Sequence, residues 1–130
     1  MTDEQTVLSR RAVACPKWRL VPGMLTHEGR RVMQVWPDDL GIHWSHLLDN
    51  RVVRDADALP DLTDAATVGC LLALVRAAWG DPFLCPAADR ETGWWLDGYA
   101  AVDYLQSYRS EAEALVAALE GALSQGSPTD

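Results

Sequence analysis

Hydrophobic residues recur along the chain with two different periods, and the helical period is clearest over residues 63–79. Apolar side chains follow spacings of three and four residues at Val68, Leu71, Leu72, Val75 and Trp79. Thr63 or Asp64 can cap the start of this helix, and Gly80 before Asp81-Pro82 ends it. The pattern therefore predicts one helix, with Leu71, Leu72 and Val75 among its most buried side chains.

The opposite side of this helix is also poor in polar residues, because Arg76 is its single charged residue. A helix that is apolar nearly all round is usually covered on more than one side. It is therefore either the central helix of the fold or part of a contact between copies of the chain.

Two further helices are indicated at the ends of the chain. Residues 3–14 form a short helix in this interpretation, which begins at Thr2 or Asp3 and is stopped by Pro16. Ser110 and Glu113 have the spacing of a capping box, so a helix starts there. Its apolar row is Ala112, Leu115, Val116, Leu119, Ala122 and Leu123. Residues 124–130 are polar, and we expect a mobile tail.

Strand-like patterns separate these helices. Residues 18–26 and 30–36 are rich in β-favouring side chains, and the link 27–29 contains a glycine suited to a hairpin. The Asp97-Gly98 pair between aromatic runs predicts a second hairpin. Residues 37–64 contain prolines, glycine and many aspartates, so we expect a mostly irregular excursion with one short strand pair that turns at Asp49-Asn50.

The order of elements predicts the fold class. Short hairpin links favour antiparallel pairing, so we expect an α+β domain with helices packed on an antiparallel sheet. The central apolar helix and the C-terminal helix both pack on one face of this sheet in the prediction. A chain of 130 residues has the size of one domain, which we assign to residues 1–123, with the tail at 124–130.

Charge narrows the classes of partner. The net charge of −8 argues against direct binding of nucleic acid, because phosphate contacts need clustered lysine and arginine. Residues 1–36 hold six basic and three acidic side chains, whereas residues 37–64 hold two and seven. This uneven distribution predicts an acidic face.

The cysteines and the apolar segments bear on location. Cys15, Cys70 and Cys85 are odd in number and form no CxxC pair, which favours buried, reduced thiols in a reducing cytosol. The N-terminus lacks the pattern of a signal peptide, and no apolar segment reaches the length of a membrane span. We therefore expect a cytoplasmic protein with no membrane contact.

Candidate chemistry is sparse. His43 and His46 form an HxxH pair beside several aspartates, which resembles part of a metal site, but ordinary loop histidines are the commoner interpretation of this spacing. No nucleophile, metalloprotease, phosphate-loop or dinucleotide motif is present. The sequence therefore predicts no catalytic residue, no metal ligand and no cofactor.

The aspartates of residues 38–64 are the most usable functional feature. A dense anionic patch steers association with a basic partner, and one exposed tryptophan beside it would anchor the contact. A solvated acidic loop is the alternative. The residues that we predict to bind a partner are Asp38, Asp39, Asp55, Asp57, Asp61 and Trp44.

Three segments carry a resemblance to a known group of proteins. Residues 15–24, 60–82 and 110–123, which read CPKWRLVPGM, PDLTDAATVGCLLALVRAAWGDP and SEAEALVAALEGAL, resemble small uncharacterised proteins encoded by tailed bacteriophages and prophages. These three segments make up about a third of the chain, and the resemblance brings no active site with it. It implies a phage gene product that works in the cytoplasm of a bacterial host.

Two hypotheses of different class follow. In the first, the chain is a non-catalytic phage or prophage accessory protein that binds a host or phage protein through an acidic face, with mimicry of nucleic acid as one form of this. In the second, it is a small metal-dependent enzyme that uses the region of His43 and His46.

Overall fold

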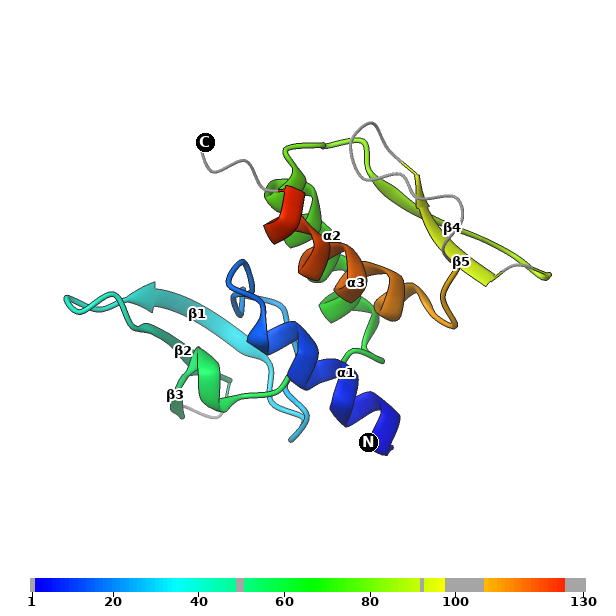
Figure 1. Ribbon diagram of the computed structural model, residues 1–130. Coiled ribbons are helices and arrows are strands. Elements are labelled where there is room, and N and C mark those ends of the chain that lie inside the picture. The colour runs from blue at the N-terminus through cyan, green and yellow to red at the C-terminus, as the bar shows by residue number, and fades with distance from the viewer. Residues whose placement is uncertain (1, 49–50, 92, 98–106, 126–130) are drawn as a thin grey trace.

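The chain folds as a single α+β domain with three helices and two antiparallel sheets (Figure 1). The computed structural model describes residues 2–48, 51–91, 93–97 and 107–125. The elements in chain order are α1 (Asp3–Ala14), β1 (Val32–Pro37), β2 (His43–Leu47), β3 (Val52–Arg54), the short 3-10 helix η1 (Asp55–Asp57), α2 (Ala65–Trp79), β4 (Cys85–Asp89), β5 (Gly93–Asp97) and α3 (Glu111–Gln125). The helices lie between the two sheets (Figure 1).

The ends of α1 and α2 confirm the local signals in the sequence. Thr2 caps α1: its hydroxyl accepts a hydrogen bond from the Gln5 backbone, and the Gln5 side chain accepts one from the Thr2 backbone. Asp64, rather than Thr63, caps α2 and accepts a hydrogen bond from the Thr67 N–H at 3.0 Å. Gly80 closes α2 in a left-handed conformation, with φ of 65°.

The capping prediction for α3 is confirmed with one change. Ser110 Oγ accepts a hydrogen bond from the Glu113 N–H at 3.1 Å. The Glu113 carboxylate accepts from the Arg109 N–H at 3.3 Å, instead of from the Ser110 N–H. The helix runs to Gln125, so the first two residues of the predicted tail are helical, and residues 126–130 lie outside the described residues.

Replacing Ser110 with alanine should lower the free energy of unfolding by about 1 kcal/mol, because one N–H at the start of α3 loses its acceptor. Urea denaturation of the parent and the variant measures this difference. Adding Glu113→Ala should lower the free energy of unfolding further, because the Arg109 N–H then loses the Glu113 carboxylate as its hydrogen-bond acceptor. An unchanged midpoint for Ser110→Ala would contradict the role of this cap.

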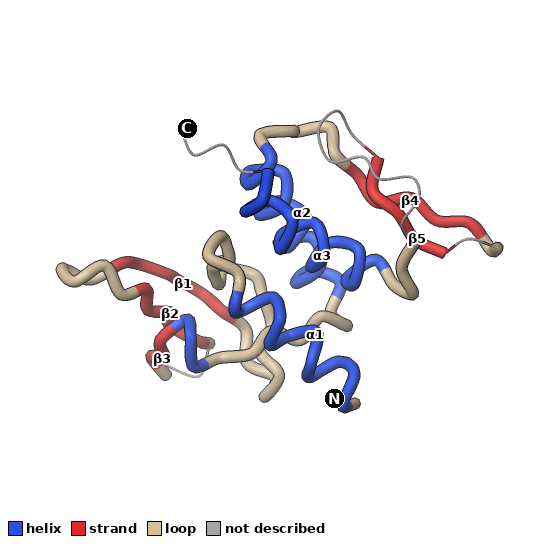
Figure 2. The backbone as a smooth tube through the Cα atoms, viewed as in Figure 1, coloured by secondary structure: helices blue, strands red, loops and turns tan. Residues whose placement is uncertain are grey.

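The first sheet is built from other strands than those of the predicted hairpin. β1 pairs with β2, and β2 pairs with β3, so β1 does not pair with residues 18–26 as a strand. The predicted link at 27–29 does turn the chain back, because Leu25 bridges Arg31 and the Val32 N–H donates a hydrogen bond to the Met24 carbonyl at 2.8 Å. The earlier segment is nevertheless drawn as loop in Figure 2, and Thr26 forms an isolated bridge with Pro60. Pro22 lacks an N–H and Gly23 has φ of 102°, so the segment cannot continue as a regular strand.

Residues 37–64 agree with the prediction in outline. β2 and β3 form the expected short strand pair, whose turn at Asp49-Asn50 lies outside the described residues. Apart from these two strands, the end of β1 at Pro37 and the short helix η1, the described part of the segment is irregular, as expected. The pairing of β2 with β1 was not predicted, because β2 is only five residues long and shows little alternation in the sequence.

The second sheet is a hairpin of β4 and β5. Its turn lies around Arg90-Glu91. The hairpin predicted at Asp97-Gly98 falls mostly on residues 98–106, which lie outside the described residues. The chain returns antiparallel to β5 at one bridge, between Trp94 and Tyr108.

The core forms between the helices and the inner sides of both sheets. α3 packs against α2 and also contacts α1 and the β4–β5 hairpin. Leu71 and Val75 of α2 are fully buried, whereas Leu72 is half-buried, so the prediction for Leu72 was wrong. Leu72 lies about 100° around the helix from Leu71, at the edge of the covered side. Among the described residues, no helix is long and apolar enough to cross a membrane.

The three cysteines are free. Cys15 is buried, Cys70 is half-buried and Cys85 is exposed, so the expectation of burial was wrong for Cys85. Leu84 is buried, and the next residue of an extended chain points the other way. Burial raises the pKa of the Cys15 and Cys70 thiols, which keeps both in the unreactive neutral form.

Candidate functional site

The outer side of the β1–β2–β3 sheet presents an aromatic surface. In the strand register, Trp36 lies opposite Trp44, and Trp44 lies opposite Arg54. The next row on the same side consists of Gln34, His46 and Val52. We call these six residues the outer sheet face. The alternate residues point inward, and Ser45 and Leu47 of β2 are buried.

Asp38 holds the end of this face in place. One carboxylate oxygen accepts hydrogen bonds from the Leu40 and Ile42 N–H groups at 2.8 and 2.9 Å, and the other accepts from Trp44 Nε1 at 2.9 Å. The bond from Trp44 and those from the backbone lower the pKa of Asp38. This hydrogen bond fixes the orientation of the Trp44 ring.

Exposed apolar side chains collect on this sheet. Seven large hydrophobic residues are exposed in the described part of the chain, and five of them belong to the β1–β2–β3 sheet or its turns: Met33, Trp36, Leu40, Leu48 and Val52. Leu40, at the tip of the β1–β2 turn, is 84 % exposed. A cluster of this kind marks an interaction site more often than scattered single residues do.

The six residues predicted to bind a partner lie at different places in the structure. Asp38, Asp39 and Trp44 come together at the β1–β2 turn, beside Trp36. Asp57 is exposed on η1, separate from this turn. Asp55 and Asp61 accept hydrogen bonds from other residues of the chain.

Asp55 is an internal connector. One of its carboxylate oxygens accepts a hydrogen bond from the Leu20 N–H at 3.1 Å, and the other accepts from Ser45 Oγ at 2.8 Å. It thus ties the loop after α1 to the middle strand of the sheet. Asp61 accepts hydrogen bonds from the backbone and hydroxyl of Thr63, just before α2. Neither carboxylate is a free docking group.

The predicted separation of charge along the chain is partly cancelled in three dimensions. Arg31, from the basic N-terminal segment, forms an ion pair of 2.7 Å with Asp64, from the acidic segment, and lowers the pKa of that carboxyl. Arg51, from the acidic segment, pairs with Glu28 of the basic one at 3.6 Å. These ion pairs join the basic and the acidic segment at two places.

The HxxH pair does not form a joint ligand set. His43 and His46 both lie on β2, three residues apart, so their side chains point to opposite sides of the sheet. One ion cannot take both imidazoles there. No group of three or more His, Cys, Asp or Glu side chains with the spacing of a metal site occurs among residues 2–48, 51–91, 93–97 and 107–125.

Sequence reasoning missed Trp36, Leu40 and Val52 as parts of a site. The burial of β1 does not alternate, since Met33, Gln34, Trp36 and Pro37 are all exposed and the register shifts between Val32 and Gln34. The period of two that marks a one-sided strand was therefore absent from this segment.

Comparisons of the chain with protein-family models, with curated proteins and with solved structures gave no match.

Proposed function

We propose that this chain is a non-catalytic binding protein that docks a partner protein on the outer sheet face and the adjoining β1–β2 turn. The observation that carries the proposal is the concentration of exposed large hydrophobic residues on this one sheet. Trp36 is 37 % exposed and lies next to Trp44, whose ring is fixed by Asp38. Tryptophan is one of the residues enriched among the energetically important positions of protein interfaces.

Charge supports a basic partner. The chain has a net charge of −8, and Asp39 adds a free-standing carboxylate to the turn beside the aromatic residues. Long-range attraction raises the rate of association with a positive surface, while the apolar contact supplies most of the affinity. The acidic character therefore steers the partner, and the tryptophans hold it.

The resemblance to phage and prophage proteins narrows the choice of partner within this proposal. We propose a protein of the bacterial host, or another phage protein, that the chain meets in the host cytoplasm. Affinity purification from infected host cells, followed by mass spectrometry, is the way to identify it.

The dissociation constant of the purified partner then tests the site. Trp36→Ala should weaken binding by about 30-fold or more, the change for a hot spot of about 2 kcal/mol. Leu40→Ser should weaken it as well, without a cost to folding, because this side chain is 84 % exposed. Binding should also weaken as salt shortens the screening length from about 10 Å at 0.1 M.

Phe83→Ser is the matched control. Phe83 is 72 % exposed, but it lies in the loop between α2 and β4, away from the first sheet. Binding should survive this change. If Phe83→Ser weakens binding as much as Trp36→Ala and Leu40→Ser, the outer sheet face is not the docking site. Affinity that does not depend on salt would rule out a basic partner.

A further inference from the structure

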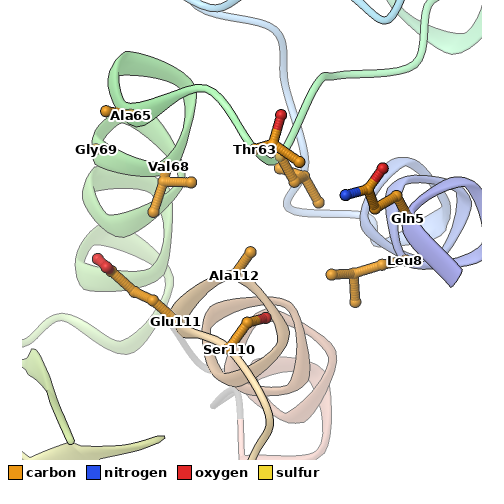
Figure 3. Close-up of a pocket in the computed structure, with 10 residues that line it drawn as sticks. Gln5, Leu8, Thr63, Ala65, Val68, Gly69, Ser110, Glu111 and Ala112 are labelled. Carbon is orange, nitrogen blue, oxygen red and sulfur yellow. The ribbon is translucent and has the colours of Figure 1, made fainter. Parts of the chain in front are cut away.

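A cavity lies where the three helices come together, far from the outer sheet face. It has a volume of about 620 Å³ and lies between the first two turns of α1, the start of α2 and the start of α3 (Figure 3). This volume is within the range of about 300–1,000 Å³ that is usual for small-molecule sites. The space exists because α2 presents only Ala65 and Gly69 toward it, next to Val68.

The wall of the cavity is mainly apolar. It is formed by Leu8, Leu62, Val68 and Ala112. Leu62 and Ala112 are buried residues of the core. Gln5, Thr63 and Ser110 add polar groups at the rim, and Figure 3 shows them around the same space. An apolar wall with a few polar groups at its rim fits a ligand that has an apolar body and a polar head.

Glu111 is the one charged residue that lines this cavity. Its side chain is half-buried and reaches toward Val68 of α2 (Figure 3). No basic side chain forms an ion pair with it within 4.0 Å in the described part of the chain. The nearby arginines are engaged elsewhere: Arg11 pairs with Glu120, and Arg109 pairs with Glu4.

The helix dipoles oppose a cation here, so their size has to be compared with that of the side-chain charges. α2 and α3 both begin at the cavity, and two helix N-termini amount to about one positive charge in total. The free N–H groups at both helix starts are capped, by the Asp64 carboxylate in α2 and by the Ser110 hydroxyl in α3. A ligand in the cavity therefore meets two capped helix ends and the Glu111 carboxylate, which favours a positive ligand.

We propose that this cavity binds a small organic cation, with its ammonium group at the Glu111 carboxylate and its apolar body between Leu8, Leu62 and Val68. The unpaired carboxylate selects the charge of the ligand, and the apolar wall selects a short aliphatic or aromatic body. This site is independent of the docking proposed for the outer sheet face.

The test uses three probes with the same six-carbon body and different heads: hexylammonium, hexan-1-ol and hexanoate. Each is titrated into the full chain, and the backbone amide signals of Leu8, Val68 and Gly69 are followed by NMR. Hexylammonium should bind about tenfold more tightly than hexan-1-ol, as one charge-assisted contact of about 1.4 kcal/mol would give. Hexanoate should bind most weakly of the three.

Two variants assign the contacts. Glu111→Gln keeps the shape of the side chain and should weaken hexylammonium binding about tenfold, while leaving hexan-1-ol unchanged. Gly69→Leu should abolish binding of all three probes, because the new side chain fills the cavity. A Cβ at this helical position meets no atom within 4 Å, so the fold should tolerate it. Glu91→Gln, on the β4–β5 turn, makes the same charge change away from the cavity and should have no effect.

Three results would overturn the proposal. Equal affinity for the three probes would show that charge is not recognised. Unchanged hexylammonium binding by Glu111→Gln would remove the carboxylate from the site. Amide signals that do not move at millimolar probe, or that move equally in Gly69→Leu, would show that the cavity takes no such ligand.

Discussion

Replacing Leu71 with alanine should lower the free energy of unfolding by about 2–5 kcal/mol. Leu71 has no exposed surface and lies on the side of α2 that packs against the core. Truncation removes buried methyl groups and leaves a space that α3 and the loop before β1 fill only in part. Urea denaturation of the parent and the variant, monitored by far-UV circular dichroism, measures the loss.

Leu72→Ala is the matched control, because it makes the same chemical change one residue away on the same helix. Leu72 is half-buried, so its loss should be clearly smaller than that of Leu71→Ala. Equal losses would mean that the side of α2 that bears Leu72 is as tightly packed as the side that bears Leu71. A small loss for Leu71→Ala would place α2 at the periphery.

The helices could be predicted because their signals are local. The caps at Thr2, Asp64 and Ser110 each lie within three residues of the N–H group that they satisfy. Burial on α2 was harder to predict, since its apolar residues extend almost round the helix and periodicity alone does not show which side faces α3. Leu72 was misassigned for this reason.

The sheets were predicted less well because strand pairing is not local. Residues 18–26 have the composition of a strand, yet Trp18, Leu20 and Met24 are buried as parts of a loop. β1 instead pairs with β2, in a segment whose aspartates suggested an irregular loop. The β propensity of a segment does not say which segment will lie beside it.

The candidate site shows the same limit. Asp38 and Trp44 were both selected from the sequence, but their hydrogen bond depends on the β1–β2 turn, which the sequence analysis did not predict. Asp55 was selected for its charge, but its carboxylate accepts a hydrogen bond from the Leu20 N–H, which is 35 residues away in the chain. Such a long-range contact cannot be seen in the sequence. The cavity at the helix ends could not be predicted at all, since it is formed by residues from three separate segments.

The bridge between Trp94 of β5 and Tyr108 lies just before α3, and its contribution to stability can be tested. Gly93 has φ of 86°, and a Cβ built there would lie 2.6 Å from the carbonyl oxygen of Tyr108. That oxygen accepts a hydrogen bond from the Trp94 N–H at 2.9 Å, and the Tyr108 N–H donates one to the Trp94 carbonyl at 2.8 Å. This bridge precedes Ser110, the cap of α3, by two residues.

Gly93→Ala should therefore lower the free energy of unfolding by about 3–4 kcal/mol, from backbone strain of about 1–2 kcal/mol and the loss of two hydrogen bonds of about 1 kcal/mol each. Gly29→Ala is the control that separates these causes. Gly29 has φ of 83°, but a Cβ there meets no atom within 4 Å, so only the strain applies and the loss should be about 1–2 kcal/mol. Urea denaturation gives both values, and hydrogen exchange of the Trp94 and Tyr108 amides reports on the bridge itself. If both variants lose the same stability and both amides stay protected in Gly93→Ala, the bridge bends without breaking and does not control the entry into α3.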